Sequence, residues 1–142
     1  MSHRLPVLAL TALVALVAPT APVIAGPASA ADCPAYSGCP LTYTLIKAPA
    51  TVERGERARI KVKVGSDGNF APQGRVTLVV VRAMGGFKWE DNKKYRGKPV
   101  AFRTPTLTKR GKYVVKARFD AKPGSIAKDS DNRARFRVVR RG

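Results

Sequence analysis

The most constraining feature of this 142-residue chain is a strict two-residue alternation between Ala58 and Val64. Every second residue in this segment is apolar, and each residue between them is Arg or Lys. Successive side chains of an extended strand point to opposite faces of a sheet, so a period of two predicts a half-buried strand. Its buried face comprises Ile60, Val62 and Val64, and its solvated face comprises Arg59, Lys61 and Lys63.

Three further segments carry strand signals. Residues 75–82 are rich in β-branched side chains, residues 112–119 alternate around Tyr113, and residues 133–138 alternate between Arg and apolar side chains. Turn-forming residues follow the first strand and precede the last one. The apolar faces predict a core made of Ile60, Val62, Val64, Val76, Leu78, Tyr113, Val115, Ala117, Phe119, Phe136 and Val138.

Residues 83–104 carry a weaker pattern. Phe87–Trp89 can form a short strand, and Glu90–Asn92 is typical of a turn. Residues 98–102 can then pair back on that short strand, and Pro99 would confine them to a sheet edge.

Together these segments predict about seven short strands separated by turns, the pattern of an antiparallel β-sandwich. The 44% hydrophobic content is sufficient for a core. We see no helical periodicity beyond residue 30. The expected organisation is a signal peptide over 1–30, an N-terminal segment over 31–46 and one β domain over 47–142.

The first thirty residues have the order of a secretory signal peptide. A basic start is followed by the uncharged apolar run Leu5–Val17, then by three prolines and the small-residue sequence Ala28-Ser29-Ala30. An uncleaved membrane anchor is the alternative, but a spanning helix needs about 20 apolar residues and the prolines interrupt this one. We therefore expect a secreted or cell-envelope protein with no transmembrane span after cleavage.

Cys33 and Cys39 enclose five residues that include Gly38 and Pro34. An even number of cysteines in an exported chain favours a structural disulfide. A redox or metal site is the alternative. The spacing is not that of a CxxC motif, however, and a metal site would lack further thiolate or imidazole ligands.

Charge and histidine content limit the possible functions. The chain has 27 Lys and Arg against 9 Asp and Glu, a formal net charge of +18, and its single histidine is His3. Cleavage after Ala30 would leave no histidine, which excludes Ser-His-Asp and Cys-His catalysis and His-ligated metal sites. We predict no cofactor and no metal.

The carboxylates do not indicate a catalytic or calcium-binding site. The closest acidic pairs are Glu53/Glu56 and Glu90/Asp91, which we expect in solvated turns or strand ends. A calcium loop around residues 129–132 is the other candidate, but Arg133 stands where an EF-hand requires an oxygen ligand. A turn before the last strand is the better interpretation, and we predict that the protein is not an enzyme.

Three sequence steps resemble the bacterial Ig-like repeat domains of secreted and cell-surface proteins. They are Ala50–Val52 with Gly55 and the alternating strand, Pro72–Leu78, and Leu107 followed by Gly111–Phe119. The resemblance covers residues 47–140 and implies an Ig-like sandwich in which Tyr113 is a structural corner residue. It implies a spacer, stalk or adhesion role, although the chain holds a single copy.

The functional hypothesis rests on the last two long strands. Consecutive antiparallel strands are usually neighbours, so their outward cations should form one basic face. Such a face attracts polyanions by counterion release. The expected partners are an anionic cell-envelope glycopolymer, an anionic lipid surface or extracellular DNA, and the predicted polyanion-binding residues are Lys112, Lys116, Arg118, Arg133, Arg135 and Arg137.

A second, weaker hypothesis concerns apolar residues on the outer face. If Val76 and Leu78 point inward, Val79 and Val81 point outward, and Val114 should lie beside them. Exposed contiguous apolar area suggests an interface. The alternative function is therefore a structural or protein–protein interaction module without a polyanion site, whose charge serves solubility.

Overall fold

The computed structural model describes residues 40–142, which form eight strands and no helix. The predicted signal peptide and the Cys33–Cys39 pair lie outside the described residues. The strands are β1 (Thr42–Lys47), β2 (Thr51–Glu53), β3 (Arg59–Ser66), β4 (Gln73–Arg82), β5 (Lys88–Arg96), β6 (Val100–Arg103), β7 (Gly111–Ala121) and β8 (Ser130–Val139).

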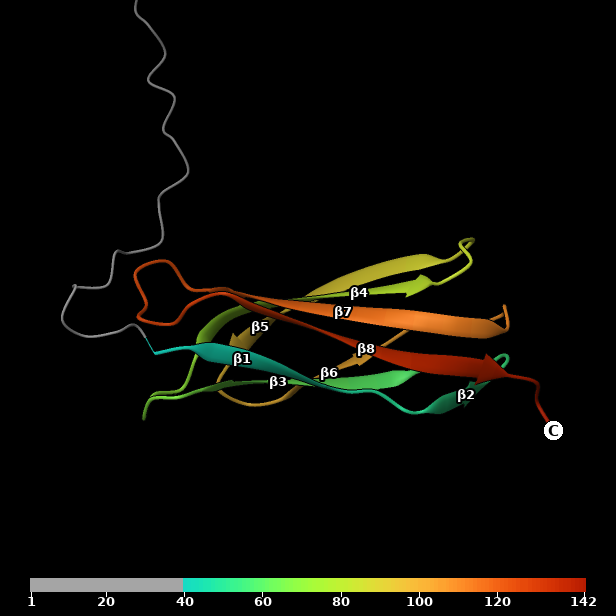
Figure 1. The fold of residues 1–142 in the computed structure, drawn as a ribbon, viewed down its shortest axis with the longest axis horizontal. Helices are drawn as coiled ribbons and strands as arrows, with labels where there is room; N and C mark the ends of the chain where they lie inside the picture. Colours follow the sequence, from blue (N-terminus) through green and yellow to red (C-terminus); the bar gives the residue numbers. More distant parts are fainter. Residues whose placement is uncertain (1–39) are drawn as a thin grey trace, which may run out of the picture.

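The strands form two sheets that face each other (Figure 1). One sheet has the order β1-β3-β6, and the other has the order β2-β8-β7-β4-β5. All neighbouring strands are antiparallel except β2 and β8, which are parallel. The all-β prediction is confirmed, with one strand more than expected. The strand-bearing region begins at Thr42 in β1, ahead of the domain boundary expected at residue 47.

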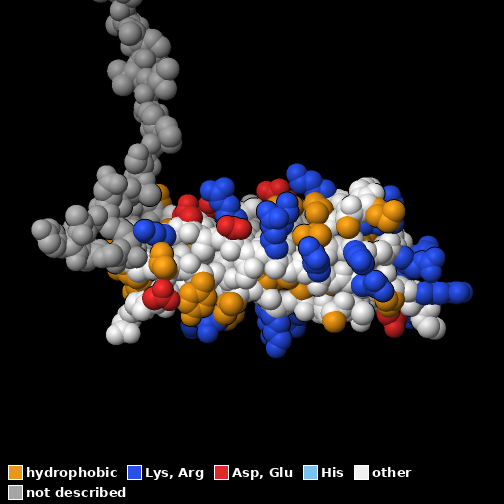
Figure 2. All heavy atoms as spheres, viewed as in Figure 1, with side chains coloured by type: hydrophobic (Ala, Val, Ile, Leu, Met, Phe, Trp, Pro, Cys, Tyr) orange, Lys and Arg blue, Asp and Glu red, His pale blue; other side chains and the backbone are white. Residues whose placement is uncertain are grey.

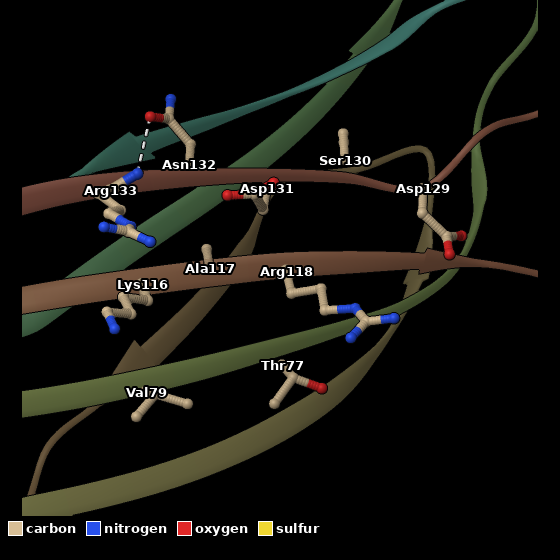
Figure 3. A pocket seen from close by; sticks show the side chains of 10 residues that line it. All are labelled: Thr77, Val79, Lys116, Ala117, Arg118, Asp129, Ser130, Asp131, Asn132 and Arg133. Atoms are coloured by element: carbon tan, nitrogen blue, oxygen red, sulfur yellow. Dashed lines mark hydrogen bonds between the residues drawn. The ribbon is translucent and has the colours of Figure 1, made fainter.

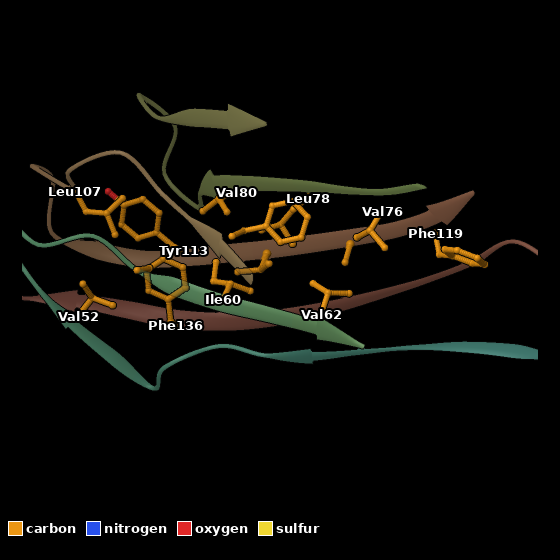
Figure 4. Close-up of a cluster of buried hydrophobic side chains, with 14 of the residues drawn as sticks. Val52, Ile60, Val62, Val76, Leu78, Val80, Leu107, Tyr113, Phe119 and Phe136 are labelled. Carbon is orange, nitrogen blue, oxygen red and sulfur yellow. The ribbon is translucent and has the colours of Figure 1, made fainter. Parts of the chain in front are cut away.

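The core lies between the two sheets (Figure 4). Every residue of the predicted core is buried, because the period of two places all of them on inward faces. Sequence reasoning missed several buried residues, of which Ala58 and Val80 lie within the clearest predicted strands and the others outside them. The missed residues are Val52, Ala58, Val80, Tyr95, Phe102 and Leu107.

The predicted turn at Glu90–Asn92 is wrong, because β5 continues through it as a nine-residue strand paired with β4. Glu90 and Asp91 therefore point to opposite faces. β5 is an edge strand of the five-stranded sheet, and the three-stranded sheet covers its inward side chains only in part. Some of its inward residues are therefore polar, and the sequence shows no clear alternation. Lys93 occupies one of these inward positions, where its ammonium group lies over the Phe102 ring and donates to the Ala101 carbonyl.

The expected return of residues 98–102 onto the preceding strand is also wrong. β6 pairs with β3 in the opposite sheet, and Ile60 lies directly opposite Phe102. The chain turns at Gly97, whose φ of 76° lies in the left-handed region that glycine adopts without strain. Crossing to the other sheet buries Phe102, which pairing at the outer edge of β5 would leave exposed.

Tyr95 joins the two sheets at the edge where β6 is too short to pair with all of β3. β6 begins at Val100, opposite Val62, so Val64 has no strand partner on that side. The Tyr95 hydroxyl fills this gap: it accepts a hydrogen bond from the Val64 N–H and donates one to the Val64 carbonyl, both at 2.9 Å. Buried backbone polar groups need such partners.

Side-chain hydrogen bonds hold β1 against β8 at the opposite edge. The Thr44 hydroxyl lies 2.8 Å from the Ser130 hydroxyl, and the Asn132 side-chain amide donates to the Thr44 carbonyl. Polar contacts therefore close both long edges around an apolar interior.

Tyr113, near the start of β7, has a buried ring that stacks on Phe136, and its hydroxyl donates to the Lys109 carbonyl at 2.7 Å. Burial raises the pKa of this hydroxyl above its ordinary value of 10.0, although the positive charge of Arg82 acts in the opposite direction. The tyrosine thus stays protonated and keeps its role as a donor at physiological pH.

We expect three Tyr→Phe substitutions to differ in cost. Tyr95→Phe leaves a buried N–H and a buried carbonyl without a hydrogen-bond partner and should lower the free energy of unfolding by about 2–4 kcal/mol. Tyr113→Phe removes one hydrogen bond and should lower it by about 1 kcal/mol. Tyr43→Phe on the outer surface is the matched control and should stay within about 0.5 kcal/mol. Urea unfolding measures the order, and equal costs at positions 95 and 43 would contradict this account.

Candidate functional site

The six cations predicted on the last two strands are all exposed on the outer face of the five-stranded sheet. β7 and β8 are neighbours, and their register places Lys112 directly opposite Arg137 and Lys116 directly opposite Arg133. Arg135 lies between these pairs, opposite Val114. The structure therefore brings five of the predicted residues into one acid-free cluster.

Arg118 departs from this cluster. Its guanidinium lies 2.7 Å from the Asp120 carboxylate, and Asp131 lies directly opposite it on β8. Along β7 and β8 the outward side chains thus change from purely basic to mixed charge, while Glu90 of β5 and Glu53 of β2 lie on the same outer face. We call the acid-free part the five-strand basic face, defined as Lys112, Lys116, Arg133, Arg135 and Arg137.

Like charges at directly opposed positions oppose folding. Directly opposite side chains have Cβ atoms about 4.5–5.5 Å apart, and a like-charged pair costs up to roughly 1 kcal/mol. Within the described residues, Lys and Arg come within 4.0 Å of a carboxylate only in the pairs Arg118–Asp120 and Arg141–Glu53. The five-strand basic face therefore lacks internal neutralisation.

The three predicted surface valines lie together. Val81 is directly opposite Val114, and Val79 is two residues from Val81 on the same face of β4. All three are half-buried rather than fully exposed. Lys88 of β5 lies opposite Val81 on the other side, and Glu90 lies opposite Val79. The valines thus form a narrow apolar strip across the sheet, bordered by charged side chains.

A shallow open hollow lies between the basic and mixed parts of this face (Figure 3). Its lining includes Lys116 and Arg133 on one side and Arg118, Asp129 and Asp131 on the other. The view shows Lys116, Arg118 and Arg133 reaching outward from neighbouring strands. Such an open surface can hold an extended chain but cannot enclose a small molecule.

Residues 130–132 belong to β8, which begins at Ser130, and Asp129 lies directly before the strand. Their oxygens are used in local structure. The Asp129 carboxylate accepts from the Ala121 N–H, and the Asn132 side-chain oxygen accepts from the Arg133 N–H. Within residues 40–142 no group of three His, Cys, Asp or Glu side chains is placed to hold a metal ion.

Sequence reasoning missed a second acid-free basic face, on the outside of the three-stranded sheet. The register places Lys47 opposite Lys61 and Arg59 opposite Arg103. None of the outward-facing residues of β1, β3 and β6 is acidic. The alternation at 59–63 indicated three of these cations, but only the pairing with β1 and β6 adds the others. We define the three-strand basic face as Lys47, Arg59, Lys61, Lys63 and Arg103.

Tyr43 and Leu45 border the three-strand basic face on β1 and are 46% and 49% exposed. Tyr43 lies opposite Gly65, and its ring occupies the space that a Cβ at Gly65 would need. Gly65 therefore allows the aromatic ring to lie across β3. Figure 2 shows hydrophobic side chains over β1, next to Lys and Arg side chains.

No protein-family model matches the chain, and no curated protein is significantly similar to it. The described part of the chain holds no helix long and apolar enough to cross a membrane.

If cross-strand repulsion acts on the five-strand basic face, salt should stabilise the protein. Raising NaCl from about 0.01 M to about 0.15 M shortens the Debye length from roughly 30 Å to roughly 8 Å, so the melting temperature should rise. Lys116→Glu should replace repulsion from Arg133 by attraction. We expect it to add about 0.5–1 kcal/mol at low salt.

Lys98→Glu, in the loop between β5 and β6, is the control, because it changes the net charge equally without a directly opposed cation. Thermal unfolding across the salt series compares the two variants. An equal gain for both would mean that net charge, and not the cross-strand pairs, sets the salt response.

Proposed function

We propose that the protein is a secreted, non-enzymatic Ig-like module that binds anionic polymers of the cell envelope or extracellular space. The Ig-like type is supported by the strand order, because in Ig domains the first, second and fifth strands share one sheet and the third, sixth and seventh share the other. In that assignment β1, β3 and β6 form the first sheet, and β4, β7 and β8 belong to the second.

The hydrogen bond from Tyr113 to Lys109 supports the same assignment. Ig-like domains carry a tyrosine near the start of the sixth strand whose hydroxyl bonds to backbone a few residues upstream. Tyr113 stands near the start of β7, the sixth strand in this assignment, and bonds four residues back. The structural role that the family resemblance implies for Tyr113 therefore agrees with its contacts.

Export is proposed from the N-terminal sequence. Leu5–Val17 followed by Ala28-Ser29-Ala30 has the order of a cleaved signal peptide, and Cys33 with Cys39 would form a disulfide in an oxidising compartment. Non-reducing peptide mapping would find both cysteines in one linked fragment. Residues 31–142 would then contain no histidine, which favours binding over catalysis.

The observation that carries the binding proposal is the opposed cationic pairs on β7 and β8. Lys112/Arg137 and Lys116/Arg133 oppose folding and have no carboxylate within 4.0 Å. A surface needed only for solubility can mix acids into such positions. Cations held together against their own repulsion gain free energy when a polyanion binds and its condensed counterions are released.

Triple charge reversal tests the five-strand basic face. We expect Lys116→Glu, Arg135→Glu and Arg137→Glu together to weaken binding to immobilised heparin by about a hundredfold, since each cation at an anionic surface contributes about 1 kcal/mol. The dependence of affinity on salt should also become shallower, because fewer counterions are released. Surface plasmon resonance across a salt series measures both quantities.

The matched control is Lys98→Glu, Lys122→Glu and Lys128→Glu, which changes net charge equally but in loops outside both faces. Its affinity for immobilised heparin should fall by less than about tenfold. Equal losses of affinity and salt slope in the two variants would show that heparin responds to net charge only, and the proposed site would be rejected.

The half-buried valine strip favours a second candidate function, a protein–protein interaction module. The variant Val79→Thr, Val81→Thr and Val114→Thr makes the strip polar and should leave heparin affinity within about twofold if the polyanion function is correct, because it removes no charge. Analytical ultracentrifugation of wild type and variant tests the alternative. Wild-type self-association that the variant loses would favour the interaction module.

A further inference from the structure

The two basic faces lie on opposite sides of the molecule. The five-strand basic face points away from the core on one sheet, and the three-strand basic face points away from it on the other. Figure 2 shows Lys and Arg side chains along both the upper and lower sides of the same view. A ligand on one face therefore leaves the other face free.

The separation of the faces lets them act independently. Facing sheets pack about 10 Å apart, and the outward side chains add further distance on both sides. The Debye length at physiological ionic strength is about 8 Å. Two polyanions bound on opposite faces are thus separated by more than one Debye length, so their mutual repulsion is largely screened.

Each face presents its cations as a line along a strand. Arg133, Arg135 and Arg137 alternate along β8, and Arg59, Lys61 and Lys63 alternate along β3. Alternate residues of a strand are about 7 Å apart, and the strands follow the long axis of the molecule (Figure 1). A line of regularly spaced cations matches a linear polymer with repeating negative charges.

We propose that the protein bridges two linear polyanion chains, one on each basic face. This inference rests on the proposed polyanion-binding function and adds bivalency to it. Because each face is complete within one chain, bridging requires no dimer. Bound to a polymer network, a bivalent module links neighbouring chains, and the second contact gains from the high local concentration of polymer.

Two-step capture on immobilised heparin tests the inference. The protein is first bound at a concentration where light scattering shows a monomer, and its surface density is recorded. Fluorescent soluble heparin is then applied. Wild type should capture it. A variant with either face reversed, applied at a higher concentration to offset its weaker binding, should bind the surface through its remaining face and capture no more than a protein-free surface does.

The variants are matched in charge. Lys116→Glu, Arg135→Glu and Arg137→Glu reverse one face; Arg59→Glu, Lys61→Glu and Lys63→Glu reverse the other; Lys98→Glu, Lys122→Glu and Lys128→Glu are the loop control. All substituted side chains are exposed, and circular dichroism verifies folding. Surface densities are matched before the second step, and the loop control should capture as wild type does.

The outcomes separate the two proposals. If wild type binds the surface but captures nothing, or if both single-face variants capture as well as wild type, bridging is overturned while polyanion binding stands. If wild type fails to bind immobilised heparin at all, the proposed function and the bridging inference both fall.

Discussion

The two hydrogen bonds between Tyr95 and Val64 satisfy the backbone of β3 where that strand has no neighbour on one side. A sheet of five strands faces a sheet of three, so the wider sheet overhangs, and β3 loses its partner where β6 begins. A side chain from the wider sheet supplies the missing donor and acceptor. Because this contact satisfies the buried N–H and carbonyl of Val64 without another strand, the smaller sheet needs only three strands.

Sequence periodicity predicted the core but not its edges. In β3, β4, β7 and the C-terminal part of β8 the inward side chains are buried, so the period of two is visible and the inward residues could be identified. β5 lies at an edge, where inward positions such as Asp91 and Lys93 are only partly covered, and its pattern resembled a turn. Tyr95 and Phe102 become core residues only through pairing across the sheets, which local sequence does not encode.

The candidate site was also predictable where local alternation decides it and not where strand pairing does. Alternation located the outward cations of β7 and β8, and the adjacency rule for consecutive strands brought them together correctly. It also suggested that Arg118 belonged with them, but the register placed Asp131 opposite it and Asp120 within reach. The second basic face was predicted only in part: alternation indicated Arg59, Lys61 and Lys63. Lys47 and Arg103 join them only by pairing with β3 from distant positions in the chain.

Both the core and the basic faces follow from one repeat of apolar and cationic residues. In a two-sheet structure each inward residue has outward neighbours, so strands that alternate valine with arginine or lysine build a dry interior and two charged exteriors together. The interior supplies the hydrophobic free energy that offsets repulsion within each face. Hydrophobic burial does not depend on which cations lie outside, and so the surface charge can serve binding while the fold stays the same.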